Sequence, residues 1–230
     1  NDSLTALLAD SVANIDKVVA DHASVAVVIN DAAGQTPTAE NLSTIGGKTS
    51  GTVTVENAAA ISGSVTDVTA ALVTDPTKVV LGDASTVTVS GAVTAKEGAD
   101  IASVAKATAT FSNGVDDALA KLASSGAIMT DLTSLLGDDA TVTITINDAG
   151  TLTAAAADLK AIGGATSGAV TVENAAAISG TIADVTAALV DVDTKVALDT
   201  ASMVSVNDVV SASEGAAIAD VANATATYAG

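Results

Sequence analysis

The sequence predicts an α/β repeat protein, an elongated solenoid of strand–turn–helix coils with one parallel sheet backed by short helices. Three observations predict it. The chain repeats itself at a fixed offset, short β-branched runs recur within each copy, and helix-capping patterns stand between these runs. One such unit cannot bury its apolar stripe alone, whereas stacked units bury a continuous core.

The repeat divides the chain into two modules. The run 49–72 reads TSGTVTVENAAAISGSVTDVTAAL, and the run 166–189 reads TSGAVTVENAAAISGTIADVTAAL, at an offset of 117 positions. The offset holds without a gap to the end of the chain. We therefore expect modules at residues 1–117 and 118–230, stacked in one continuous solenoid.

Eight short runs have the period-2 pattern of a strand with one buried face. Each alternates apolar and polar residues, and most end in Asp, Asn or Gly, which turn the chain. The runs are Val27–Asp31, Val53–Asn57, Val87–Gly91, Ala109–Asn113, Ile144–Asp148, Val170–Asn174, Val204–Asp208 and Ala226–Tyr228. Successive starts from residue 27 are 26, 34, 22 and 35 residues apart. We expect one strand in each coil.

Helix signals lie between these runs. A hydroxyl followed three residues later by a carboxylate can cap a helix start, and Pro after Thr with a later Gly pair marks a start and an end. The signals are Thr94 with Glu97, Ser211 with Glu214, Ser64 with Asp67, Thr181 with Asp184, and Thr36 before Pro37 with Gly46 and Gly47.

Two points of the fold stay open. The extra pieces Pro76–Leu81 and Asp193–Leu198 are compatible with a short strand or a loop. A doubly wound globule and two separate α/β domains are the alternative folds.

Composition and charge exclude several classes of protein. The chain has 27 acidic and 8 basic residues, a net charge of −19, no Cys and only 1% aromatic residues. Such a charge disfavours nucleic acid and anionic membrane surfaces as partners. No run of 18 apolar residues exists, so we expect no membrane insertion. The mean hydropathy of +0.52 argues against disorder.

The sequence offers little to an enzyme. His22 is the only imidazole, and Asp139 replaces it in the second module. The acidic pairs Asp116–Asp117 and Asp138–Asp139 are more typical of caps than of a catalytic dyad. No zinc, P-loop, nucleophile-elbow or dinucleotide motif occurs. We expect no catalytic residues and no organic cofactor.

Calcium is the one cofactor that the sequence favours at all. Aspartates crowd the predicted turns, and Ca²⁺ takes six to eight oxygen ligands. The candidate ligands are Asp31, Asp83, Asp148, Asp199 and Asp208. Because neither the EF-hand spacing nor the glycine-rich nonapeptide is present, strand termination and helix capping are the alternative role for these residues.

Threonine pairs suggest a second kind of binding surface. Thr-x-Thr recurs at 52–54, 86–88, 108–110, 141–145 and 225–227. If these strands stack, the hydroxyls and methyls form a flat array like that of ice-binding β-solenoids. Alternatively, Thr is present because it is a good strand former on an exposed face. Threonine side chains that point inward would exclude an ice-binding surface.

The chain resembles the tandem repeats of very large, acidic, Cys-free secreted proteins of cyanobacteria and other marine bacteria. The resemblance lies in runs such as VTVENAAAISGSVTDVTAAL at 53–72 and VSVNDVVSASEGAAIADVANATA at 204–226. These relatives are adhesin-like or surface-layer-like. The resemblance implies an extracellular or cell-surface location and carries over no catalytic residue.

We therefore expect a non-enzymatic structural or adhesive repeat segment. Its expected partners are neighbouring repeats of the same parent chain. Self-association and binding of surface glycans are secondary expectations. The alternative is a binding module that uses the strand face or the Asp-rich turns for calcium, glycan or ice.

Overall fold

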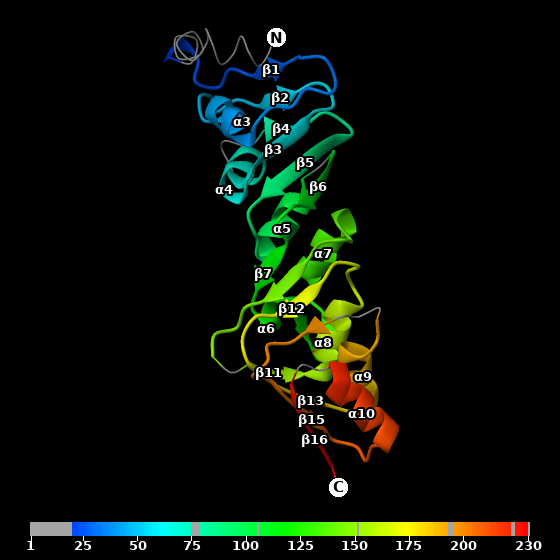
Figure 1. Cartoon of the computed structure of the whole chain (residues 1–230). Coiled ribbons are helices and arrows are strands. Elements are labelled where there is room, and N and C mark those ends of the chain that lie inside the picture. The colour runs from blue at the N-terminus through cyan, green and yellow to red at the C-terminus, as the bar shows by residue number, and fades with distance from the viewer. Residues whose placement is uncertain are drawn as a thin grey trace. The chain divides into compact units, whose positions relative to one another are not determined.

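The chain forms two compact units (Figure 1). Unit 1 comprises Asn1–Ala92 and Glu97–Asn113, and unit 2 comprises Val93–Lys96 and Gly114–Gly230. The computed structural model describes residues 20–74, 79–104, 106–150, 152–192, 196–221 and 224–229. Both units are mixed α/β structures with parallel sheets, so the predicted fold class is confirmed at this level.

Unit 1 contains two three-stranded parallel sheets. The first has the order β1 (Val27–Ile29), β2 (Val53–Val55) and β4 (Val79–Val80). The second has the order β3 (Ala60–Ser64), β5 (Ser85–Ser90) and β6 (Ala107–Phe111). The partner of a residue lies 26 positions further along the chain in the pairs β1–β2, β2–β4 and β3–β5, and 22 positions further in β5–β6.

Unit 2 contains two four-stranded parallel sheets and one small hairpin. The first sheet has the order β14 (Val196–Ala197), β12 (Val170–Val172), β10 (Ile144–Ile146) and β7 (Val115–Asp117). The second has the order β11 (Leu152–Ala155), β13 (Ala176–Gly180), β15 (Met203–Val206) and β16 (Thr225–Tyr228). The hairpin pairs β8 (Ala123–Ser124) with β9 (Ala127–Ile128).

Short helices connect the strands. They are α3 (Ala39–Gly46), α4 (Val65–Val68) running into the π-helical η1 (Thr69–Val73), α5 (Ala95–Ala102), α6 (Leu119–Leu122), α7 (Thr130–Asp138), α8 (Ala156–Gly163), α9 (Ile182–Leu189) and α10 (Ala212–Val221). In unit 1, α3 packs against α4 and η1. In unit 2, α9 contacts both α8 and α10, so these three helices form a row (Figure 1).

Each unit is built from repeated segments that are called rungs. A rung consists of one strand from each of the two sheets and the helix that follows these two strands. In unit 2, for example, β12, β13 and α9 make one rung, and β14, β15 and α10 make the next. Consecutive rungs add one strand to each of the two sheets. This arrangement explains why strand partners recur along the chain, at offsets of 22 to 29 residues and most often 26.

The prediction of a single sheet is wrong. All eight predicted runs overlap strands, but they alternate in pairs between two sheets: β1 and β2 lie in one, and β5 and β6 in the other. The missed strand β3 has the sequence AISGS, in which only Ile61 is β-branched and buried. Gly63 belongs there because an added Cβ would lie 2.8 Å from the Cβ of Ala39. Small residues therefore form a strand that helix α3 can approach closely.

The helix signals are mostly confirmed. Ser64 and Thr181 cap α4 and α9 by accepting the N–H of Asp67 and Asp184, and Ser211 and Glu214 form the reciprocal capping box. The start of α3 was misplaced by two residues, because Thr38 rather than Thr36 accepts the N–H of Asn41. The helix ends at Gly46 as predicted.

The two open pieces each contain a short strand. Val79–Val80 forms β4 and Val196–Ala197 forms β14, while residues 76–78 and 193–195 lie outside the described residues. The core of both units is built from Val, Ile, Leu and Ala, with Phe111 as its one aromatic member among the described residues. Thin layers of small side chains suit rungs only two strands and one helix wide.

Candidate functional site

Buried hydroxyl groups join neighbouring rungs at equivalent places in the two modules. The Oγ1 of Thr49 lies 3.1 Å from the carbonyl oxygen of Ala23 and 2.7 Å from that of Val25. In the second module, the Oγ1 of Thr166 lies 3.2 Å from the carbonyl oxygen of Ala140 and 2.6 Å from that of Val142. Each Oγ1 also accepts the N–H of the glycine two residues later.

A second pair of buried hydroxyl groups occurs at equivalent positions of the two modules. The Oγ of Ser85 accepts the N–H of Ala59, and the Oγ of Ser202 accepts the N–H of Ala176. Together with Thr49 and Thr166, these are the buried polar residues of the described chain. Their hydroxyls are bonded to backbone groups of the neighbouring rung, so they hold rungs together.

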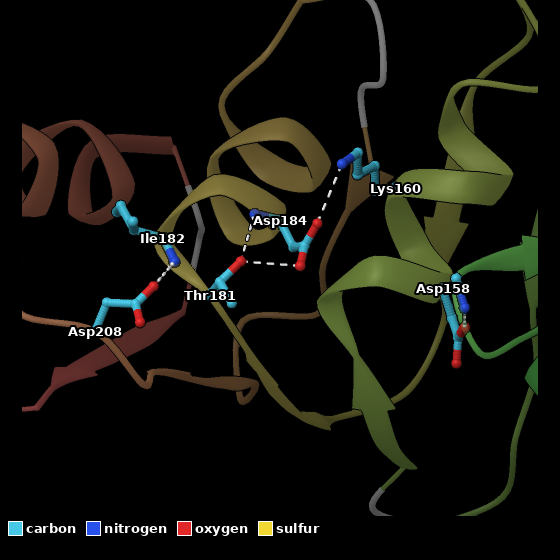
Figure 2. Close-up of polar contacts among 7 residues, drawn as sticks. Asp158, Lys160, Thr181, Ile182, Asp184 and Asp208 are labelled. Carbon is cyan, nitrogen blue, oxygen red and sulfur yellow. Dashed lines mark hydrogen bonds and ion pairs between the residues drawn. The ribbon is translucent and has the colours of Figure 1, made fainter.

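Three aspartates cap helices of the preceding rung. The carboxylate of Asp117 accepts the N–H of Ala95 at 3.0 Å, that of Asp148 accepts Leu119 at 2.7 Å, and that of Asp208 accepts Ile182 at 2.8 Å. Figure 2 shows the Asp208 bond at the start of α9. These carboxylates satisfy N–H groups that a helix start leaves without partners.

The other calcium candidates have different surroundings. Asp83 forms an exposed ion pair with Lys106 at 3.2 Å, and the Oδ1 of Asp199 accepts the N–H of Ala201 within its own turn. At Asp31, the backbone oxygen accepts the side-chain amide of Asn57. Within the described residues, no group of three or more His, Asp and Glu side chains could hold a metal ion. The five candidates therefore do not converge there, and calcium binding stays a prediction.

The remaining candidates for chemistry are His22, its counterpart Asp139 and the pair Asp116–Asp117. His22 is exposed, and Asp139, its counterpart, accepts the N–H and hydroxyl of Thr141. Of the pair Asp116–Asp117, the second residue caps α5, and Asp116 has an Oδ1 that is buried without a hydrogen-bond partner among the described residues.

The helix row of unit 2 carries a connected polar group at its surface. Thr181 and Asp184 form the cap of α9, and the Nζ of Lys160 on α8 bonds to Asp184 at 3.1 Å (Figure 2). The hydrogen bonds from Thr181 and then Lys160 hold the pKa of Asp184 below its ordinary value. On α10, Ser211 likewise lowers the pKa of Glu214.

Two hollows of the described surface differ in their lining. An open hollow of about 420 Å³ in unit 2 is lined mostly by Gly and Ala around Lys160 and Asp184. A groove of about 230 Å³ in unit 1 is lined by apolar residues such as Leu72 and Val79 and also by Asp100 and Ser103. There the Ser103 hydroxyl donates a hydrogen bond to the backbone oxygen of Asp100.

The second sheet of unit 1 presents a regular hydroxyl face to solvent. In register across β3, β5 and β6 stand the outward rows Ala60, Thr86, Thr108 and Ser62, Thr88, Thr110, all exposed. Thr38 pairs with Ser62 and extends the second row. The six strand positions together with Thr38 are hereafter called the hydroxyl face. It carries no charge and no large side chain on a chain of net charge −19.

The single-sheet prediction required the Thr-x-Thr runs to form one array. They do not form one. None of their threonines is buried, but Thr54 and Thr145 lie on the other sheets, in β2 and β10. In unit 2 the face equivalent to the hydroxyl face is interrupted by Met203. Two complete rows are therefore found in the second sheet of unit 1, whereas in unit 2 the row Ser179, Ser205 and Thr227 keeps its hydroxyls and the row with Met203 does not.

Sequence reasoning missed the buried hydroxyls and the aspartates that cap the preceding rung. The triplet Thr-Ser-Gly at 49–51 and again at 166–168 was the available signal for the buried hydroxyls. The capping bonds of Asp117, Asp148 and Asp208 join residues 22 to 29 positions apart. They could not be found without knowing which strands are neighbours.

No protein-family model, no curated protein and no solved structure matches the chain. In the part of the chain that the structure describes, no helix combines the length and the apolar character that a bilayer crossing needs.

Proposed function

We propose that this chain is a non-enzymatic structural or adhesive repeat segment of a bacterial extracellular or cell-surface protein, wound as a solenoid. The observation that carries the proposal is the reuse of the same bonds at positions 117 apart: Thr49 and Thr166, Ser85 and Ser202, and the side-chain amides of Asn57 and Asn174. Each of these side chains bonds to a neighbouring rung.

The register of the strands supports the solenoid. An advance of 22 to 29 residues from strand to strand, most often 26, is what a chain produces when it winds repeatedly through a similar path. Stacking of the modules 1–117 and 118–230 in one continuous solenoid stays a prediction.

Charge and composition support the structural role. A net charge of −19 keeps repeated segments from associating without specificity. The buried polar side chains of the described residues act on backbone groups, which favours a scaffold over a catalyst.

The location can be tested directly. Antibodies raised against the folded chain should label intact cells of the bacterium that carries the gene, without permeabilisation. Labelling that requires permeabilised cells would contradict an extracellular role. A broad screen for hydrolase and transferase activities should find none above that of a heat-unfolded sample, and robust turnover would overturn the non-enzymatic assignment.

A second candidate function is binding of ice or glycan at the hydroxyl face. The in-register, uncharged rows favour it, because parallel strands place hydroxyls about 4.8 Å apart between strands and about 6.6 Å apart along a strand. Thermal hysteresis of a dilute solution tests the ice version. The variant T88K/T110K should abolish any hysteresis, while T52K, outside the hydroxyl face, should leave it unchanged. Wild-type protein without hysteresis removes the ice version, and a glycan array tests the other.

Calcium binding at the Asp-rich turns is tested by calorimetry with calcium and with a chelator. A melting temperature that rises strongly with calcium would support metal sites at Asp31, Asp83, Asp148, Asp199 or Asp208. Because four of these carboxylates already accept backbone N–H groups or pair with lysine, we expect the melting temperature to stay within about 2 °C.

A further inference from the structure

Unit 2 contains two stretches that occupy equivalent positions of the repeat but have different surroundings. Val93–Lys96 is covered by Gly114–Asp117: Val93 donates its N–H to the oxygen of Gly114 at 3.0 Å and accepts the N–H of Asp116 at 2.8 Å. The carboxylate of Asp117 then accepts the N–H of Ala95, the first residue of α5. A strand segment and a cap therefore complete this stretch.

The counterpart 117 residues later, Val210–Ser213, lacks this cover among the described residues. The backbone groups of Val210 and the N–H of Ala212 have no hydrogen-bond partner there. Val93 and Ala95 are each 1% exposed, whereas Val210 is half-buried and Ala212 is exposed. Ala212 is the first residue of α10, as Ala95 is of α5.

The two helices are alike in one respect. Ile101 on α5 and its counterpart Ile218 on α10 are both fully buried, so each helix packs this side chain on its own rung. By contrast, Tyr228 is 37% exposed where Phe111 is 3% exposed, and the neighbouring Val209 is 79% exposed. Exposed apolar side chains beside unpaired backbone groups are typical of a surface that another chain segment covers.

We propose that Val210–Ala212, with Val209 and Tyr228 beside it, is the docking site for the Gly-Val-Asp-Asp segment of a further copy of the module. The first residues of this segment pair in parallel with Val210, as Gly114–Asp116 pairs with Val93, and its last aspartate caps α10. This inference rests on the proposed function, because it takes the partner to be another repeat of the same kind. The covered Val93–Lys96 stretch supplies the template.

The test compares two chains by residue-resolved amide hydrogen exchange. The first is the 230-residue protein, and the second continues after Gly230 with a further copy of Gly114–Gly230, which keeps the offset of 117. In the extended chain, the amides of Val210 and Ala212 should exchange at least about tenfold more slowly, approaching Val93 and Ala95.

A matched variant separates the strand from the cap. Replacing the appended copy of Asp117 by Ala should return Ala212 to fast exchange and leave Val210 protected. Slow exchange at both residues in this variant would contradict the assigned capping role.

The outcomes distinguish this inference from the proposed function. Protection of Val93 and Ala95 in the 230-residue chain, without slowing at Val210 and Ala212 in the extended chain, overturns the docking site alone. An appended copy whose strand residues copied from Ile144–Ile146 stay unprotected overturns it as well, since docking would order its first rung. Fast exchange at Val93 and Ala95 themselves would contradict the stacked rungs of the proposed function.

Discussion

Thr166 has a side chain that bonds only to backbone groups of its own turn and of the rung before it. Its Oγ1 reaches the carbonyl oxygens of Ala140 and Val142 and accepts the N–H of Gly168. The residue is 5% exposed, so water cannot replace these bonds if the hydroxyl is lost. The same holds for Thr49 in the first module.

Thr166→Val should destabilise the protein by about 1–3 kcal/mol, because it keeps the shape of the side chain and leaves buried backbone groups unpaired. Thr166→Ser, which keeps the hydroxyl, should cost less than about 1.5 kcal/mol. Thermal unfolding followed by circular dichroism measures both, since the chain has no Trp for fluorescence. Equal losses for the two variants would show that the methyl group, rather than the hydroxyl, matters.

Gly168 is required by close approach of the neighbouring rung. A Cβ added there would collide with the carbonyl oxygens of Thr141 and Val142, and Gly51 meets the equivalent atoms of Ser24 and Val25. Backbone atoms held between neighbouring rungs cannot move aside as a flexible side chain can. The glycine of each Thr-Ser-Gly triplet therefore sets how tightly two rungs stack.

Gly168→Ala should destabilise the protein by at least about 2 kcal/mol through this overpacking. The matched control is Gly137→Ala in α7, where an added Cβ meets no atom within 4 Å. Since Ala has the higher helix propensity, this control should be neutral or stabilising by up to about 1 kcal/mol. A Gly168→Ala protein as stable as the control in chemical denaturation would contradict the stacking of these rungs.

At the scale of an element, helices depend on carboxylates from the next rung. Asp208→Ala should destabilise the protein by about 1 kcal/mol, because the N–H of Ile182 at the start of α9 loses its acceptor. Glu173→Ala, an exposed carboxylate outside any helix, is the control for removing one negative charge. Hydrogen exchange in the first turn of α9 should quicken for Asp208→Ala alone. Unchanged exchange would show that the carboxylate does not cap this helix.

The start of α9 also predicts a dependence on pH. The Thr181 and Lys160 hydrogen bonds lower the pKa of Asp184 in the folded state. The stability they contribute is therefore fully present above the unfolded pKa of about 4 and is lost as the pH falls through the lower folded value. The stability difference between wild type and Asp184→Asn should be constant from pH 7 to about pH 5 and shrink below pH 4. A difference that grows on acidification would contradict this assignment.

Local patterns in the sequence were enough to find strands and caps, because both depend on neighbouring residues. Alternation located every predicted strand, and the hydroxyl–carboxylate spacing located the starts of α4, α9 and α10. The division into two sheets was missed, because β3 and β13 are built from Ala, Ser, Gly and one Ile each. Strand propensity is weak in such segments, and packing against a neighbouring helix decides their structure.

For the candidate sites, too, local patterns were visible in the sequence and contacts between distant residues were not. Turn aspartates were recognised as a group, but whether each binds a cation, a lysine or a helix start depends on partners distant in sequence. Asp83 meets Lys106, while Asp148 meets Leu119. Only the three-dimensional arrangement of the rungs separates these roles.

At the scale of the whole molecule, the composition agrees with a thin repeated core. Small apolar residues fill the layers, buried hydroxyls recur at the offset of the repeat, and acidic residues cover the surface. A repeat protein of this kind gains stability from contacts between nearest neighbours, so each added rung extends the structure without a new core design. Each sheet takes its successive strands from successive rungs.

Spin labels on the row Ala155, Ser179, Ser205 and Thr227 measure this order of the strands. These exposed residues are in register on β11, β13, β15 and β16, and the chain contains no Cys, so cysteines for labelling can be placed in pairs. With one label fixed at Ala155→Cys, electron paramagnetic resonance should give label-to-label separations that increase from Ser179→Cys to Ser205→Cys to Thr227→Cys, because each strand adds about 4.8 Å between the labelled backbones. Separations in another order would contradict the stacked rungs.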